Sequence, residues 1–140
     1  MRIMAVDYGD ARTGLAVSDE TASITGDAWV IHNNNEHGIS SMIVSEAVTR
    51  NVGKIIIGHP KNMNGTVGPR AEKSERLAGL VRALCDIEVL LWDERMTTIS
   101  AHQVLTETGR FGKKRKKKVD AVAASLILEN YLAYLKSTRS

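Results

Sequence analysis

The stretch RIMAVDYGDARTGLAVS, residues 2–18, decides the fold of this chain. A first apolar run ends in the turn signal Asp7-Tyr8-Gly9-Asp10, and a second run resumes from Thr13 to Ser18. Gly9 and Gly14 give the backbone freedom around the connection. The stretch therefore predicts a β-hairpin whose first strand ends in an aspartate.

Strand and helix signals alternate through the rest of the sequence. The β-branched run KIIIG at 54–58 is typical of a strand buried on both faces, and Pro69 is a favoured first-turn helix residue. Strands are also expected at 28–31 and 88–93, helices at 38–50, from 69, after 97 and from 119, and loops at 33–35, 59–68 and 109–118. This order predicts one α/β domain over residues 1–140, with a mixed five-stranded sheet, antiparallel and then parallel, flanked by helices.

Composition excludes several classes of protein. A length of 140 residues, with 43% hydrophobic and 25% charged residues, indicates a globular chain that can bury a core without disulfides or a structural metal. The single cysteine, Cys85, excludes an internal disulfide, and we interpret it as a packing residue. The sequence lacks an apolar run of about 18 residues and a signal-peptide pattern. We therefore expect a cytoplasmic protein without a membrane partner.

The basic charge is concentrated in one run. Of 19 lysines and arginines, six are consecutive at 113–118, which leaves 13 basic against 16 acidic residues elsewhere. Such a run favours a local site for a polyanion, because each basic group near a phosphate releases condensed counterions. The alternative is a solvated basic loop without a partner.

Acidic residues stand at the ends of predicted elements. Asp7 ends the first strand, Asp93 and Glu94 end the last, and Asp120 lies in the first turn of the C-terminal helix. Such ends can gather carboxylates around one point, and oxygen ligands suit Mg²⁺ or Mn²⁺. The alternative is that each acid only caps a helix or ends a strand.

Four stretches in the same order resemble the bacterial YqgF/RuvX family. They are Asp7-Tyr8-Gly9 with 12–19 (RTGLAVSD), 58–69 (GHPKNMNGTVGP), 93–98 (DERMTT), and the basic loop with 119–128 (VDAVAASLIL). The resemblance implies an RNase H-like fold, similar to RuvC-type Holliday-junction resolvases. It also implies a metal-dependent nuclease that processes the 5′ end of pre-16S rRNA.

The same resemblance implies a catalytic, metal-binding set of Asp7, Glu94 and Asp120. In related nucleases the middle acid follows the fourth strand, where this chain has Gly58-His59-Pro60. Glu94 lies one strand farther out and must reach back about another 4.8 Å. Asp93 competes for the role, although adjacent strand residues point to opposite faces.

Phosphate contacts are predicted next to these motifs. The loop after the fourth strand and the start of the following helix could receive a phosphate, and His59 could approach the substrate. The predicted nucleic-acid-binding residues are Arg12, Lys61, Asn62, Arg70, Arg95, Lys113, Lys114, Arg115, Lys116 and Lys117. The alternatives are a helix-capping turn for the loop and a structural ion pair for Arg95.

Three functions remain open from the sequence. The first is endonucleolytic cleavage of structured nucleic acid, either pre-16S rRNA or branched DNA, by metal-activated water. The second is a non-catalytic RNA-binding assembly module, and the third is an ATPase-like member of the actin and sugar-kinase fold, which the length disfavours. A resolvase would need a homodimer, whereas an RNA-trimming enzyme could act as a monomer.

Overall fold

The computed structural model describes residues 1–33, 35–94 and 113–138, with side chains from 121 onward in the last range. Its five strands are β1 (Arg2–Tyr8), β2 (Arg12–Ser18), β3 (Thr25–His32), β4 (Val52–His59) and β5 (Glu88–Asp93). Its helices are α1 (Glu36–Thr49), α2 (Pro69–Leu84) and α4 (Lys113–Thr138). None of the described helices is long and apolar enough to cross a membrane.

The strands form one mixed sheet in the order β3-β2-β1-β4-β5. β1 pairs antiparallel with β2, with Asp7 opposite Gly14, and parallel with β4, with Val6 opposite Ile57. The Gly9 amide donates to the Arg12 carbonyl at 3.1 Å and closes the hairpin. A Cβ at Gly9 would lie 2.4 Å from that carbonyl oxygen, so the turn requires glycine. The predicted mixed five-stranded sheet is therefore confirmed.

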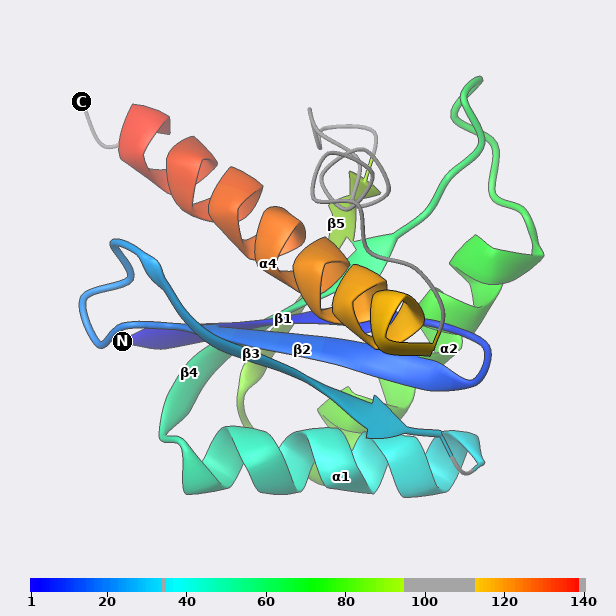
Figure 1. Ribbon diagram of the computed structural model, residues 1–140, viewed down its shortest axis with the longest axis horizontal. Coiled ribbons are helices and arrows are strands. Elements are labelled where there is room, and N and C mark those ends of the chain that lie inside the picture. The colour runs from blue at the N-terminus through cyan, green and yellow to red at the C-terminus, as the bar shows by residue number, and fades with distance from the viewer. Residues whose placement is uncertain (34, 95–112, 139–140) are drawn as a thin grey trace.

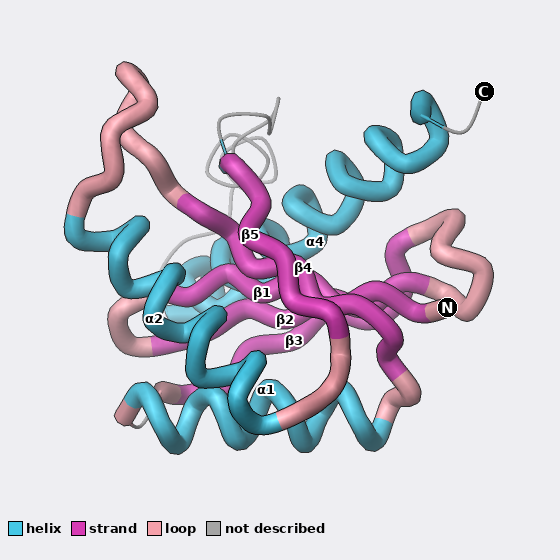
Figure 2. Tube along the Cα trace, turned by 180° about the vertical axis from the view of Figure 1, so that it is seen from behind, coloured by secondary structure: helices cyan, strands magenta, loops and turns pink. Residues whose placement is uncertain are grey.

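Two layers of helix cover the sheet (Figure 1). On one face α1 and α2 pack against each other (Figure 2) and against Met4 and Val6 of β1. On the other face α4 crosses β1, β2 and β3 and buries Ile3 and Ala5. Successive residues of β1 thus alternate between two cores, as the period of a strand requires. This alternation also decides the face on which each residue after the strands points.

The start of α4 differs from the predicted one. We expected the basic run to lie in a loop ending at Lys118, but the helix begins at Lys113. Lysine and arginine are good helix formers, and the run contains neither glycine nor proline, so nothing in it ends a helix. The prediction of a basic loop at 113–118 is wrong, because the run forms the first turns of α4.

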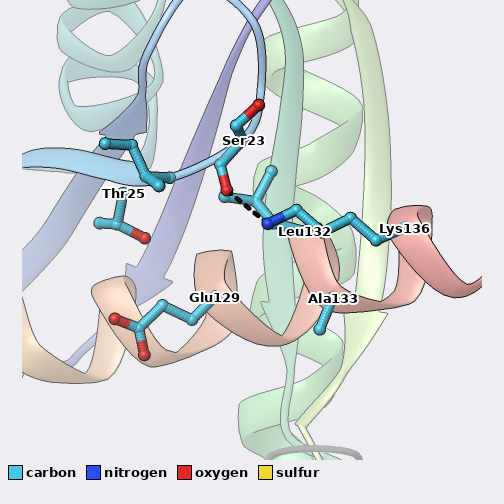
Figure 3. A pocket seen from close by; sticks show the side chains of 7 residues that line it. Ser23, Thr25, Glu129, Leu132, Ala133 and Lys136 are labelled. Atoms are coloured by element: carbon cyan, nitrogen blue, oxygen red, sulfur yellow. Dashed lines mark hydrogen bonds between the residues drawn. The ribbon is translucent and has the colours of Figure 1, made fainter.

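The far end of α4 contacts the β2–β3 connection. Lys136 Nζ donates a hydrogen bond to the Ser23 carbonyl at 2.9 Å, beside a groove that Thr25 and Glu129 also line (Figure 3). Ser18, at the end of β2, accepts a hydrogen bond from the Ile3 amide. The groove therefore lies at the amino end of β1, opposite the end that carries Asp7.

Leu128→Ala should destabilise the fold strongly. Leu128 is fully buried in the core beneath α4, and a large-to-small change in such a place costs about 2–5 kcal/mol. Urea unfolding followed by circular dichroism measures the loss. Leu84→Ala is the matched control, because Leu84 is 51% exposed, and it should cost less than about 1 kcal/mol. Equal losses would contradict the packing of α4 described above.

Candidate active site at the carboxyl ends of β1, β4 and β5

Asp7 and Glu94 meet on the face of the sheet that α4 covers. Ala5 belongs to the core beneath α4, so the alternation of β1 brings the Asp7 side chain to the same face. Trp92 of β5 also belongs to that core, and Glu94 is two residues farther along. The Glu94 carboxyl forms a side-chain hydrogen bond with Asp7. The structure therefore brings together two of the three predicted carboxylates.

Glu94 reaches Asp7 by passing over β4. In the sheet order β4 lies between β1 and β5, and the β4 residue on this path is Gly58. A Cβ built on Gly58 would lie 2.5 Å from Glu94 Oε1 and 3.1 Å from Glu94 Cδ. The carboxyl thus occupies the space directly above Gly58. We expected Glu94 to bridge one extra strand spacing. It does so above Gly58, which has no side chain.

The environment of Glu94 disfavours its charged form. Burial, followed by the negative charge of Asp7, raises the pKa of Glu94 to about 7 from an ordinary 4.5. The positive charge of Arg70 acts in the opposite direction and lowers this pKa. Glu94 is therefore partly protonated near neutral pH, and a cation bound beside it would favour the loss of that proton.

The side chains of Asp93 and His59 point to the other face of the sheet, which α1 and α2 cover. Val89 and Leu91 of β5 belong to the core beneath α1 and α2, which places Asp93 on their side. His59 of β4 is buried there, and its Nε2 lies 2.8 Å from Glu75 Oε2 of α2. Hence the structure gives His59 a role in holding α2 against the sheet. The predicted approach of His59 to a substrate has no support in this geometry.

The β4–α2 loop is ordered by its own side chains. Asn62 Nδ2 donates to Thr66 Oγ1 at 2.9 Å, and Asn64 Oδ1 accepts from the Thr66 amide at 3.1 Å. Pro69 begins α2 as predicted, after the N-cap residue Gly68. The loop rises from the sheet on the same side as α4 (Figures 1 and 2). It therefore forms a raised border beside the carboxylates, with the Asn62 amide already committed to the loop.

The other predicted phosphate contacts are placed only in part. Arg70 is exposed, and its charge acts on Glu94, whereas Lys61 is half-buried in the loop. Arg12 begins β2 and already has an interaction within the protein. Arg95 lies outside the described residues, as do the side chains of Asp120, Lys113, Lys114, Arg115, Lys116 and Lys117. Their predicted roles remain predictions.

The donor set fits a hard divalent cation. Two carboxyl groups in contact, one of them partly desolvated, offer the oxygen ligands that Mg²⁺ and Mn²⁺ prefer. Among the side chains that the structure describes, no group of three His, Cys, Asp or Glu residues forms a metal site. A third ligand would have to come from elsewhere, and Asp120 on α4 is the predicted one.

Comparison with known proteins identifies the family. The model of the family described as "RuvX: Holliday junction resolvase" matches residues 1–134. The chain belongs to the RuvX family. A Bacillus cytotoxicus relative named "Putative pre-16S rRNA nuclease" is 45% identical, covering 94% of this chain and 98% of its own. A relative of the same name from Halothermothrix orenii is 41% identical, covering 96% of each chain.

Solved structures support the fold assignment. RuvC of T. thermophilus in complex with a Holliday junction substrate aligns with a TM-score of 0.58 at 14% identity, covering 96% of each chain. The Fowlpox virus resolvase in complex with Holliday junction DNA gives 0.58 at 14% identity, covering 96% of this chain and 99% of its own. These likenesses confirm the RNase H-like fold predicted for this RuvX family member.

In the sequence, Gly58 marks only a place where related nucleases have an acid. The structure shows instead that its lack of a side chain provides the space for Glu94. A glycine inside a strand often marks the close approach of another group. That signal was present in KIIIG at 54–58, but which group approaches depends on the strand order.

Glu94→Gln should stabilise the metal-free protein at high pH. The pKa of Glu94 is raised from an ordinary 4.5 to about 7 in the folded chain. The free energy of unfolding of the wild type therefore falls as the pH rises from 4.5 to about 7. The glutamine variant does not lose this stability, because glutamine does not ionise. Its advantage should grow by up to about 3 kcal/mol between about pH 4 and about pH 8, since one pKa unit corresponds to about 1.4 kcal/mol.

Urea unfolding across this pH range, with a metal chelator present, measures the difference. Glu129→Gln is the control, because Glu129 is exposed on α4 and should follow the wild-type curve. Parallel curves for wild type and Glu94→Gln would contradict the raised pKa of the partly buried Glu94 carboxyl.

Proposed function

We propose that this chain is a metal-dependent endonuclease that cleaves structured nucleic acid and processes the 5′ end of pre-16S rRNA in ribosome biogenesis. The observation that carries the proposal is the Glu94 carboxyl held against Asp7 above Gly58. Two carboxyl groups in contact, one of them partly buried with a raised pKa, are typical of functional sites. The names of the curated relatives support RNA as the substrate.

Asp7, Glu94 and Asp120 are the proposed holders of Mg²⁺ or Mn²⁺. The bound ion would lower the pKa of a water molecule and neutralise charge that develops on the scissile phosphate. The carboxylates would bind and orient the ion, and the partial burial of Glu94 would limit competing water. Arg70, exposed at the start of α2, would contact a substrate phosphate close to the pair.

Substrate binding is proposed to extend from this centre along two elements. The β4–α2 loop would offer Lys61 and the backbone around Asn62, and α4 would offer its basic first turns. The full proposed contact set is Arg12, Lys61, Asn62, Arg70, Arg95, Lys113, Lys114, Arg115, Lys116 and Lys117. These groups address phosphate and carry no base specificity.

Branched DNA is the second candidate substrate. The description of the RuvX family as a Holliday junction resolvase favours it. A resolvase cuts two strands and would act as a homodimer, whereas trimming of one RNA end requires only a monomer. Cleavage assays on both ligands distinguish the two, and binding of RNA without cleavage would instead identify a non-catalytic assembly module.

Asp7→Asn should abolish cleavage of precursor ribosomal RNA while leaving the fold and RNA affinity largely intact. The change removes a charged oxygen ligand and keeps the shape of the side chain. Initial rates in Mg²⁺ or Mn²⁺, together with RNA titrations and thermal unfolding, measure the three properties. Asp93→Asn is the matched control, because the Asp93 side chain points to the other face of the sheet. This variant should lose far less activity. Equal activity of Asp7→Asn and wild type would eliminate the proposed site.

The triple variant Lys114→Gln, Lys116→Gln, Lys117→Gln should weaken RNA binding and flatten its salt dependence. Each lost contact to a single-strand phosphate lowers the slope of log affinity against log salt by about 0.7. Turnover at saturating substrate should change much less, because these residues position the backbone. Titration of labelled RNA and four-way DNA junctions across a salt series measures the slope.

The variant Lys136→Gln, at the opposite end of α4, controls for the loss of one positive charge away from the proposed contacts. Its slope should match that of the wild type, because Lys136 lies in the last turn of α4, beside Ser23 and away from the proposed contacts. A triple variant with an unchanged slope for both ligands would show that the basic turns of α4 do not contact the substrate.

A further inference from the structure

Gly58 directly follows three bulky residues of β4. The residues before it, Ile55, Ile56 and Ile57, are all fully buried. β4 has neighbours on both sides, and Gly58 itself pairs with Trp92 of β5 in regular parallel register. A side chain at position 58 would therefore point into a packed environment on the face that α4 covers.

Three atoms occupy the space that such a side chain would need. A Cβ on Gly58 would lie 2.5 Å from Glu94 Oε1, 3.1 Å from Glu94 Cδ and 2.9 Å from Ile127 Cδ1. Two of them belong to the Glu94 carboxyl group, and the third is a buried core atom of α4. Because Ile127 blocks one direction, a methyl group at position 58 would displace the carboxyl.

Backbone conformation does not explain the glycine. Among the glycines that the structure describes, Gly65 is the one with a positive φ, at 85°. Gly58 lies in a continuous strand, where a β-branched residue is ordinarily preferred. The space above its Cα is therefore the property that only glycine supplies at this position.

We propose that Gly58 is a positioning residue of the active site, because its missing side chain seats the Glu94 carboxyl beside Asp7. Gly58 acts through Glu94 and touches neither the ion nor the substrate. The catalytic consequence rests on the proposed function, whereas the structural coupling between Gly58 and Glu94 does not. The two residues form one unit in which an acid directly after the edge strand β5 serves a site centred on β1.

Gly58→Ala should weaken the binding of Mn²⁺ to the free protein by about 10- to 100-fold, the usual range for residues that orient metal ligands. Calorimetric titration with Mn²⁺ alone gives this value without any substrate. In cleavage assays kcat should fall by a similar factor, while KM for RNA stays within about twofold, because the phosphate contacts are untouched.

Gly53→Ala is the matched control. Gly53 lies on the same strand, and a Cβ there would meet only the flexible side chain of Met1 among its nearest atoms. Its Mn²⁺ affinity and kcat should equal those of the wild type. A Gly58→Ala variant with wild-type Mn²⁺ affinity and kcat would overturn the proposal.

A double-mutant cycle on stability guards against simple misfolding. The shift in melting temperature caused by Gly58→Ala is measured in the wild type and in a Glu94→Ala background, with a chelator present. The shift should be clearly smaller without the Glu94 side chain, because two of the three close contacts are then gone. Equal shifts in the two backgrounds would mean that Gly58 serves core packing against Ile127 and would overturn the proposal.

The cycle also separates this inference from the proposed function. It requires neither metal nor nucleic acid, so a wild-type protein that cleaves no substrate would refute the nuclease while leaving the coupling measurable. A coupling that fails in an active nuclease would refute the role of Gly58 alone.

Discussion

The burial of β1 and β4 on both faces is the constraint on which the rest of the structure depends. These two strands form the parallel pair at the middle of the sheet, with Met4 and Val6 facing one core and Ile3 and Ala5 facing the other. Each face needs its own cover, and α1 with α2 supplies one while α4 supplies the other. This alternation decides to which face of the sheet the side chain of a residue at the end of a strand points.

The alternation of side chains along the strands also places the candidate site. Asp7 and Glu94 emerge on the α4 side, whereas His59 and Asp93 emerge on the side of α1 and α2. Polar residues that are neighbours in sequence thereby point to opposite faces of the sheet, Glu94 toward Asp7 and Asp93 away from it. The resulting carboxyl pair is partly buried, and this burial together with the charge of Asp7 raises the pKa of Glu94.

Gly58 shows how a carboxyl group can cross a neighbouring strand to reach Asp7. An acid at the end of β5 is separated from β1 by the full width of β4, and ordinary strand residues would fill that width. One glycine at the crossing point removes the obstacle at the price of a weaker strand position. Ile127 of α4 lies against the same space, so the helix that covers the sheet also limits where the carboxyl can move.

The sequence by itself determined the hairpin at 2–18, the buried strand at 54–58, the mixed sheet and the family, because these depend on local periodicity and on motif order. It also named Asp7 and Glu94, but left Asp93 as a competitor and placed the basic run in a loop instead of the start of α4. Only the tertiary structure decided which of the adjacent acids faces Asp7 and that Gly58 opens the path between them. The reason is physical: contacts across strands depend on strand order and register, and these are set by the packing of the whole sheet against its helices.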